Sequence, residues 1–142
     1  DKKLSAFRRQ KIGFIFQQFN LLPVLTAQEN IIMPLLLDKK KPDEAYLQEN
    51  RLSHLPHELS GGQQQHVAIA RALIAKPDII FADELTGNLD SKSGSEVMKM
   101  LCNIREKMNK TLVIITHDPH IAEMTDRRFT IIDGELSKAS VQ

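Results

Sequence analysis

The sequence has 142 residues, of which 42% are hydrophobic and 26% are charged, a composition typical of one folded globular domain. Nineteen basic and eighteen acidic side chains leave a net charge of +1, which excludes the strongly basic footprint of a nucleic-acid-binding domain. The single cysteine, Cys102, excludes an intramolecular disulfide,. The longest apolar run, residues 31–37, is far shorter than the about 20 residues of a membrane-spanning helix.

The first third of the sequence predicts a strand followed by a capped helix. Residues 12–16 form an apolar run that ends at Gln17, as in a short buried strand. Thr26, with Glu29 three residues later, is typical of a capping box that opens a helix running to Leu37. A group of basic residues near the start is more typical of a solvated helix face than of a binding patch. These residues are Lys2, Lys3, Arg8, Arg9 and Lys11.

The helix that begins at Thr26 contains Pro34, which predicts a kink,. The polar stretch after it predicts an exposed turn at residues 39–42 and a further short helix at 45–49.

The rest of the chain alternates between helices and strands. Apolar patterns predict a helix at 63–75 and a buried strand at 79–82. A longer helix at 91–108 follows, and Ser93 with Glu96 suggests a second capping box for it.

Two more strands are expected, at 112–115 and 129–132, and the second enters a tight Asp133-Gly134 turn,. Strands that alternate with helices pair in parallel, so the predicted fold class is α/β.

Two adjacent glycines, Gly61 and Gly62, follow Ser60 directly before a predicted helix. Glycines let a ligand approach the backbone closely, and the start of a helix favours an anion such as phosphate. A Ser-Gly-Gly segment by itself is more often a flexible loop. Its neighbours in the sequence therefore decide between the two interpretations.

The stretch LSGGQQQHVAIARAL, residues 59–73, resembles the signature motif of ATP-binding-cassette (ABC) transporters. Residues 79–84, IIFADE, are similar to the Walker B strand, and residues 87–90, GNLD, to the D-loop. The switch histidine and the Q-loop correspond to residues 116–118 and 16–17. Five motifs in the family's order are very hard to produce by chance, so the chain is identified as a member of the ABC ATP-binding subunits.

The resemblance implies a P-loop NTPase fold of the ABC type, with a parallel sheet flanked by helices and a helical subdomain. Residues 1–18 would form the Q-loop strand region, 19–62 the helical subdomain ending in the signature, and 63–142 the C-terminal part of the catalytic core. The sequence contains no G-x-x-x-x-G-K-[ST], the loop that cradles phosphates. We therefore expect a partial domain that lacks its N-terminal part, with an exposed strand edge at 112–115.

The resemblance also implies catalytic roles. Asp83 would hold Mg²⁺ through water, and Glu84 would polarise the water that attacks the γ-phosphate of ATP. Gln17 would contact both the metal and that water, and His117 would contact the γ-phosphate. An isolated Asp-Glu pair is more often a solvated loop and an isolated histidine is usually structural, so these roles depend on the order of the motifs.

ABC domains pair head to tail, which implies a shared site. Ser60, Gly61, Gly62 and Gln63 would contact ATP held by a second nucleotide-binding domain, and Asp90 would reach across the same interface. Closure and release of the pair would move a transmembrane permease subunit. We therefore expect a peripheral protein at the cytoplasmic face of the membrane, with no direct membrane insertion and no nucleic-acid partner.

Further details point to a branch of the family. FNLLPVLTAQEN, residues 19–30, and TGNLD, residues 86–90, resemble the branch that serves lipoprotein release and the export of macrolides and peptides. Residues 19–37 correspond to the region that contacts the permease, although an ordinary subdomain core remains an open interpretation. Leu85 stands where proline is usual and His66 where arginine is usual, and two or three helical turns are missing between Leu47 and Leu52.

Three functional hypotheses follow. The first is the ATPase subunit of a transporter. The second is a truncated chain that hydrolyses nothing and acts as an interaction module, donating its signature loop to a complete partner. An ABC ATPase of repair or translation is the third, and it is disfavoured because the insertions usual in those proteins are not seen.

Overall fold

The computed structural model describes residues 2–42 and 53–141. The short helix expected at 45–49 and the shortened region between Leu47 and Leu52 therefore lie outside the described residues. The elements are α1 (Lys2–Lys11), β1 (Ile12–Ile15), α2 (Ala27–Leu37), the 3₁₀ helix η2 (Pro56–Glu58), α3 (Gly61–Leu73), β2 (Ile79–Asp83), α4 (Ser91–Met108), β3 (Thr111–Ile115), α5 (Pro119–Glu123), β4 (Arg127–Ile132) and β5 (Glu135–Val141).

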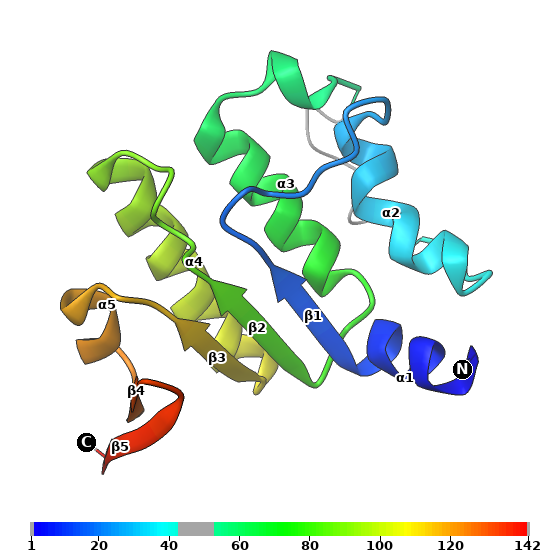
Figure 1. Ribbon diagram of the computed structural model, residues 1–142. Helices are drawn as coiled ribbons and strands as arrows, with labels where there is room; N and C mark the ends of the chain where they lie inside the picture. The colour runs from blue at the N-terminus through cyan, green and yellow to red at the C-terminus, as the bar shows by residue number, and fades with distance from the viewer. Residues whose placement is uncertain (1, 43–52, 142) are drawn as a thin grey trace.

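A parallel sheet in the order β1-β2-β3 forms the centre of the molecule, which confirms the α/β fold class (Figure 1). Ile12 pairs with Ile79, and Ile79 with Thr111. One face of the sheet is covered by α3 and α4, because a buried cluster joins both helices to β1 and β2. Its members include Ile15, Ile69, Ala72, Ile80, Ala82, Val97, Met98 and Leu101.

The opposite face of the sheet is apolar and partly exposed. Phe14 stacks on Phe16 and on Phe81, with ring centroids 5.8 and 5.5 Å apart. Val113 and Ile115 of β3 are exposed as well. Within residues 2–42 and 53–141, no strand pairs with the outer side of β3. The exposed edge expected at 112–115 is thus confirmed.

The helical part is built on α2 and α3. Thr26 and Glu29 form the expected capping box, in which Glu29 N donates to Thr26 Oγ1 (3.2 Å) and Thr26 N donates to Glu29 Oε2 (2.8 Å). The helix continues through Pro34 to Leu37. A second buried cluster packs α2 against α3 and comprises Ala27, Ile31, Leu35, Leu59, Val67 and Ile74.

The start of α3 and the cap of α4 differ from the sequence predictions. Helix α3 begins at Gly61, two residues before the predicted start, because Ser60 and Gln63 form a reciprocal capping box that places both glycines in the first turn. The second capping box predicted for Ser93 and Glu96 is wrong. Asp90 caps α4 instead, since its carboxylate accepts hydrogen bonds from the N–H groups of Lys92 and Ser93.

The C-terminal strands β4 and β5 form an antiparallel hairpin that is separate from the central sheet. Its turn lies at Asp133 and Gly134, which have φ values of 52° and 81°, as a tight two-residue hairpin turn requires. This confirms the predicted turn. In Figure 1 the hairpin lies at the opposite end of the molecule from α1.

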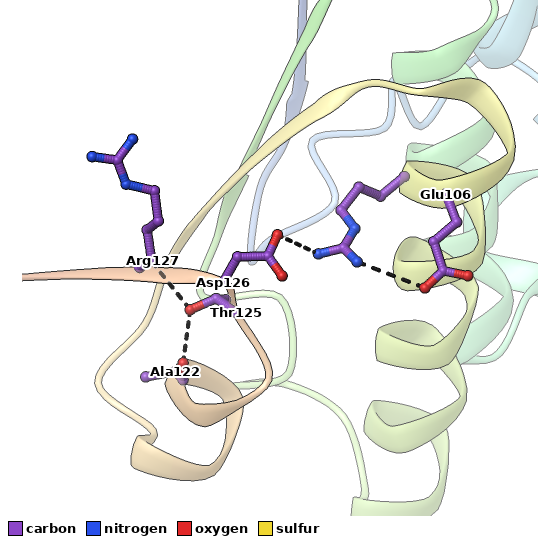
Figure 2. A network of polar contacts seen from close by, with 6 residues as sticks. Glu106, Ala122, Thr125, Asp126 and Arg127 are labelled. Atoms are coloured by element: carbon purple, nitrogen blue, oxygen red, sulfur yellow. Dashed lines mark hydrogen bonds and ion pairs between the residues drawn. The ribbon is translucent and has the colours of Figure 1, made fainter. Parts of the chain in front are cut away.

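Figure 2 shows how the start of this hairpin is attached to the helices. Arg105 of α4 donates to Asp126 (2.8 Å) and lies 3.6 Å from Glu106. Thr125 Oγ1 donates to the carbonyl oxygens of Ala122 (2.7 Å) and Arg127 (3.3 Å). The segment that leads into β4 is therefore bound to both α4 and α5.

The basic residues near the start lie on α1, as predicted for a helix face. Arg9 pairs with Asp38 at the end of α2 (2.9 Å), and Lys11 pairs with Asp78 (2.8 Å). These ion pairs use two of the basic groups to attach α1 to the rest of the chain.

Candidate functional site

The predicted catalytic side chains meet at one edge of the central sheet. Gln17 follows β1, Asp83 ends β2, Glu84 comes next in the chain, and His117 follows β3. Because the three strands are parallel, their carboxyl ends lie at the same edge, which is where open α/β sheets bind ligands. The structure brings Glu84 into direct contact with His117 and places Gln17 against the loop that follows Glu84.

Glu84 and His117 form a hydrogen-bonded pair across the sheet edge. Glu84 Oε1 accepts from the backbone N of His117 (3.1 Å) and lies 2.8 Å from its Nδ1. A carboxylate oxygen accepts, so Nδ1 carries the hydrogen. The side chain of Glu84 is 25% exposed and that of His117 is 85% exposed. The pair is thus anchored at the carboxylate and open at the imidazole.

The hydrogen bond that His117 donates to Glu84 raises the pKa of His117 above its ordinary value, and the negative charges of Glu84 and Asp118 add to the effect,. The imidazole therefore carries positive charge to a higher pH than a free histidine. A positive group at this edge favours an anionic ligand.

The backbone at Glu84 has an unusual conformation. Its φ is +46°, a left-handed value that non-glycine residues adopt at a cost of about 1–2 kcal/mol. Its N donates to the carbonyl of Ile115 (2.9 Å), and its own carbonyl accepts from Gly87 N (3.1 Å). These bonds connect the turn to β3 and hold the Glu84 side chain toward His117.

Gln17 packs on the same loop. A Cβ atom built on Gly87 would lie 2.5 Å from Gln17 Nε2, so a glycine is needed at that position for the amide to lie where it does. Asn88 Nδ2 donates to the backbone carbonyl of Gln17 (3.1 Å). Asn88 had no predicted role beyond the motif, and it connects the Q-loop to the D-loop.

Asp83 is exposed at the end of β2, opposite Ile115 in the register. In the part of the chain that the structure describes, no cluster of three or more His, Cys, Asp or Glu side chains could hold a metal. Mg²⁺ commonly uses only one or two protein carboxylates and completes its shell with water and phosphate oxygens. Asp83, with the amide oxygen of Gln17, therefore fits such an ion only together with a phosphate ligand.

The signature residues make local contacts. Ser60 N donates to Gln63 Oε1 (2.9 Å), and Gln63 N donates to Ser60 Oγ (3.3 Å). A Cβ built on Gly61 would lie 3.7 Å from Leu89 Cδ2, and one on Gly62 would lie 3.4 Å from Ser93 Oγ. The signature therefore packs against the D-loop and the start of α4. Among the hydrogen bonds of residues 2–42 and 53–141, none joins it to Glu84 or His117.

The Asp90 side chain caps the start of its own helix, α4. Its carboxylate accepts from Lys92 N (3.1 Å), Ser93 N (3.0 Å) and Ser93 Oγ (2.7 Å). The hydrogen bonds from Ser93 lower the pKa of Asp90. The structure thus assigns this residue a capping role, and its expected contact across an interface stays a prediction.

A second unpredicted contact near the site, besides that of Asn88, involves helix α3. Arg71 of α3 donates to the backbone carbonyls of Phe19 (2.7 Å) and Asn20 (2.6 Å), directly after the Q-loop. An arginine inside the apolar run VAIARAL is a usable signal, because a charged residue in such a run needs a partner. The partner could not be identified from sequence, since it is backbone.

No helix within the described ranges is both long and apolar enough to cross a membrane.

Comparisons with known proteins agree with this geometry. The ABC transporter family model matches residues 1–87. The chain is 46% identical over 152 residues to the ABC transporter ATP-binding protein MJ0796 of Methanocaldococcus jannaschii, covering 97% of this chain and 65% of that protein. It is 44% identical over 146 residues to the lipoprotein-releasing system ATP-binding protein LolD of Cytophaga hutchinsonii, covering 96% of this chain and 67% of the relative.

A solved dimeric structure of the MJ0796 cassette, in a post-hydrolysis state bound to ADP and Pi, has the same fold. The TM-score is 0.84 at 42% identity, over 99% of this chain and 67% of that chain. The chain spans about two thirds of the length of the proteins it matches. The family model, these relatives and the shared fold together show that the chain belongs to the ABC transporter family, as an ATP-binding domain.

Proposed function

We propose that this chain is part of the ATP-hydrolysing subunit of an ABC transporter, in which the pairing of two nucleotide-binding domains powers transport. The observation that carries the proposal is the contact between Glu84 and His117 at the carboxyl edge of the sheet. The contact joins a carboxylate and an imidazole at the edge where open α/β sheets bind ligands, which supports a nucleotide phosphate there.

The Glu84–His117 contact divides the chemistry between two side chains. His117 Nδ1 is used by Glu84, so Nε2 is the nitrogen that contacts the γ-phosphate. The raised pKa of His117 favours this contact with an anion. Glu84 Oε1 holds the imidazole, and Oε2 accepts a hydrogen from the attacking water and orients it. His117 then fixes the phosphate relative to that water.

Mg²⁺ and ATP fit the remaining residues. Asp83 would hold the metal through water and Gln17 through its amide oxygen, and Gln17 would also contact the attacking water. When bound, Mg²⁺ neutralises phosphate charge that the protein side chains alone would leave unbalanced. The exposure of Asp83 at the strand end supports this assignment.

The signature would complete the site of a second domain. Ser60 and Gln63 satisfy each other in the capping box, so the N–H groups of Gly61 and Gly62 are the first-turn donors left for a phosphate. Ser60 and Gly61 are exposed. The dimeric form of the related cassette supports the pairing of two such domains. In a head-to-tail pair, Asp90 would lie at the interface.

The membrane partner would be a permease, with this chain peripheral at the cytoplasmic face. Exposed apolar side chains on residues 19–37 support contact between this segment and the permease. They include Leu22, Val24, Leu36 and Leu37. The similarity to LolD supports the branch that serves lipoprotein release and related export. The transported molecule would therefore be amphiphilic.

A second candidate is an interaction module that binds a complete partner and hydrolyses nothing. The exposure of Ser60 and Gly61 at the start of α3 favours it. In this case α3 would donate Gly61 and Gly62 to nucleotide held by the partner, and Glu84 would have no substrate.

The two candidates separate in one experiment. We would titrate Mg-ATP calorimetrically into the complete gene product and into the 142-residue chain, and follow phosphate release in parallel. The proposal predicts saturable binding and phosphate release by the complete gene product, with release lowered about a thousandfold or more by Glu84→Gln and binding kept. Glu96→Gln, on the exposed face of α4, serves as the matched control.

We expect the 142-residue chain alone to give neither heat nor phosphate. If the complete gene product also gives neither, the ATPase proposal is wrong and the interaction module is favoured. Turnover by the 142-residue chain that Glu84→Gln abolishes would show that residues outside a P-loop hold the nucleotide.

A further inference from the structure

The segment between Gln17 and α2 is held by the helix that carries the signature. Arg71, in the last turn of α3, donates from its two terminal nitrogens to the carbonyl oxygens of Phe19 (2.7 Å) and Asn20 (2.6 Å). Each of the two terminal nitrogens thus donates to one of two consecutive carbonyl oxygens. Only a planar, forked donor makes this pair of contacts with little loss of side-chain freedom.

The two residues that Arg71 contacts have a conformation that needs support. Phe19 and Asn20 have φ values of 58° and 47°, both in the left-handed region that non-glycine residues rarely adopt. Phe19 N donates to the carbonyl of Phe16 (3.1 Å), which begins the turn directly after β1. Consecutive left-handed residues persist only where the surroundings hold them, and Arg71 supplies that support from another element.

The same segment lies close to the other end of α3. A Cβ built on Gly61 would lie 4.0 Å from Phe19 Cζ. Gly61 and Arg71 are ten residues apart, about 15 Å along a helix axis. Phe19, two residues after Gln17, is therefore bonded to α3 through Arg71 near the end of the helix and lies close to Gly61 at its start.

On its other side the segment is attached to the D-loop. Asn88 donates to the carbonyl of Gln17 (3.1 Å), and the Gln17 amide lies against Gly87. Arg71 itself is half-buried, and this burial lowers its pKa. Among the described residues, the Arg71 guanidinium binds carbonyl oxygens and no carboxylate. A half-buried guanidinium in such a setting carries a desolvation cost, which a purely stabilising role could avoid with an apolar side chain.

We propose that Arg71 is a positioning residue for the proposed ATPase, which locks the turn after Gln17 to the signature helix so that Gln17 and Gly61 move together. The proposal deepens the function proposed above. When a partner's nucleotide displaces the start of α3, the lock transmits that displacement to Gln17. The two halves of a shared site are thereby coordinated within one chain.

A simpler role for Arg71 is neutralisation of the negative end of α3, because cations stabilise the last turn of a helix. Lysine would serve that purpose as well as arginine, yet its point charge cannot hold two carbonyls in the fork geometry. Arg71→Lys therefore separates the two roles, and Arg71→Met removes both.

The test measures amide hydrogen exchange and ATPase kinetics on the complete gene product. We expect Arg71→Met to speed exchange at residues 16–20 at least about tenfold, while α3 and β2 keep their protection. We expect kcat to fall about tenfold with KM for ATP unchanged, because the nucleotide still binds but Gln17 is misplaced. Arg71→Lys should recover less than half of the lost protection. Arg105→Met, which removes an arginine pair near the hairpin, is the matched control and should leave exchange at 16–20 unchanged.

Three results would overturn the proposal: unchanged exchange at 16–20 in Arg71→Met, full recovery of both readouts in Arg71→Lys, or faster exchange with wild-type kcat. A wild-type protein that hydrolyses no ATP would defeat the proposed function instead. The exchange data would still decide whether Arg71 locks the turn.

Discussion

The sheet-edge site and the signature of this ABC domain are built differently. Glu84 and His117 are 33 residues apart in sequence and meet only because β2 and β3 are parallel neighbours. Ser60 and Gln63 are three residues apart and bind each other within the first turn of α3. The first region is thus assembled by the fold, whereas the second is a local motif that presents its glycines outward. This difference supports the proposal that the sheet edge is a preformed half-site and that the signature serves a ligand held elsewhere.

Of the two glycine substitutions that compare the regions, the one that fills the signature should have the larger effect on turnover. Gly61→Ala adds a methyl that meets only ordinary contacts in this chain, 3.7 Å from Leu89 and 4.0 Å from Phe19. Stability should be kept or slightly raised, because alanine is favoured over glycine in a helix. We expect phosphate release to fall about a hundredfold, since close approach to the partner's nucleotide is lost. Thermal unfolding and a turnover assay check both parts, and a parallel loss of stability would contradict the outward-facing role.

A smaller effect is expected at the sheet edge. Gly87→Ala places a Cβ 2.5 Å from Gln17 Nε2 and 3.5 Å from the Glu84 carbonyl, so the flexible Gln17 amide must move while the backbone stays. We expect turnover to fall about tenfold with an unchanged melting temperature. A double-mutant cycle with Gln17→Ala provides the control. If Gly87→Ala still lowers turnover in the Gln17→Ala background, Gly87 acts by another route.

The smallest effect is a titration shift. Glu84 holds the pKa of His117 above its ordinary value of 6.5, so Glu84→Gln should lower it, as measured by NMR of the imidazole. Since the folded-state pKa is the higher one, this contact contributes stability below the unfolded-state pKa and loses it as pH rises through the folded value. A His117 pKa that Glu84→Gln leaves unchanged would show that the two side chains do not interact in solution.

Features with local causes could be predicted from the sequence. The bounds of α4 and the cap of α2 follow from apolar spacing and from Thr26 with Glu29. The predicted start of α3 was two residues late, because glycines were assigned to a loop although the Ser60–Gln63 box places them in the helix. Ser93 was wrongly predicted to cap α4, because Asp90 lies earlier and offers a stronger acceptor,.

The site was predictable in its parts but not in its contacts. The motifs identify Gln17, Asp83, Glu84 and His117, and the parallel sheet explains why they share one edge. The support given by Arg71 could not be predicted, because backbone carbonyls at Phe19 and Asn20 leave no mark in the sequence. The left-handed backbone at Glu84 is set by its bond to β3 and was equally hidden.

The central claim is that the signature of one chain serves the sheet edge of another. Mixed dimers of the complete gene product test it directly, with single-turnover phosphate release as the measurement. If sites are shared, pairing Glu84→Gln with Gly61→Ala places both defects in one site and leaves the other intact. Pairing the double variant with wild type then damages both sites. We predict phosphate release from the first mixed dimer and little phosphate release from the second. The reverse result, with phosphate release only from the second mixed dimer, would show that each signature serves its own chain and would contradict the account.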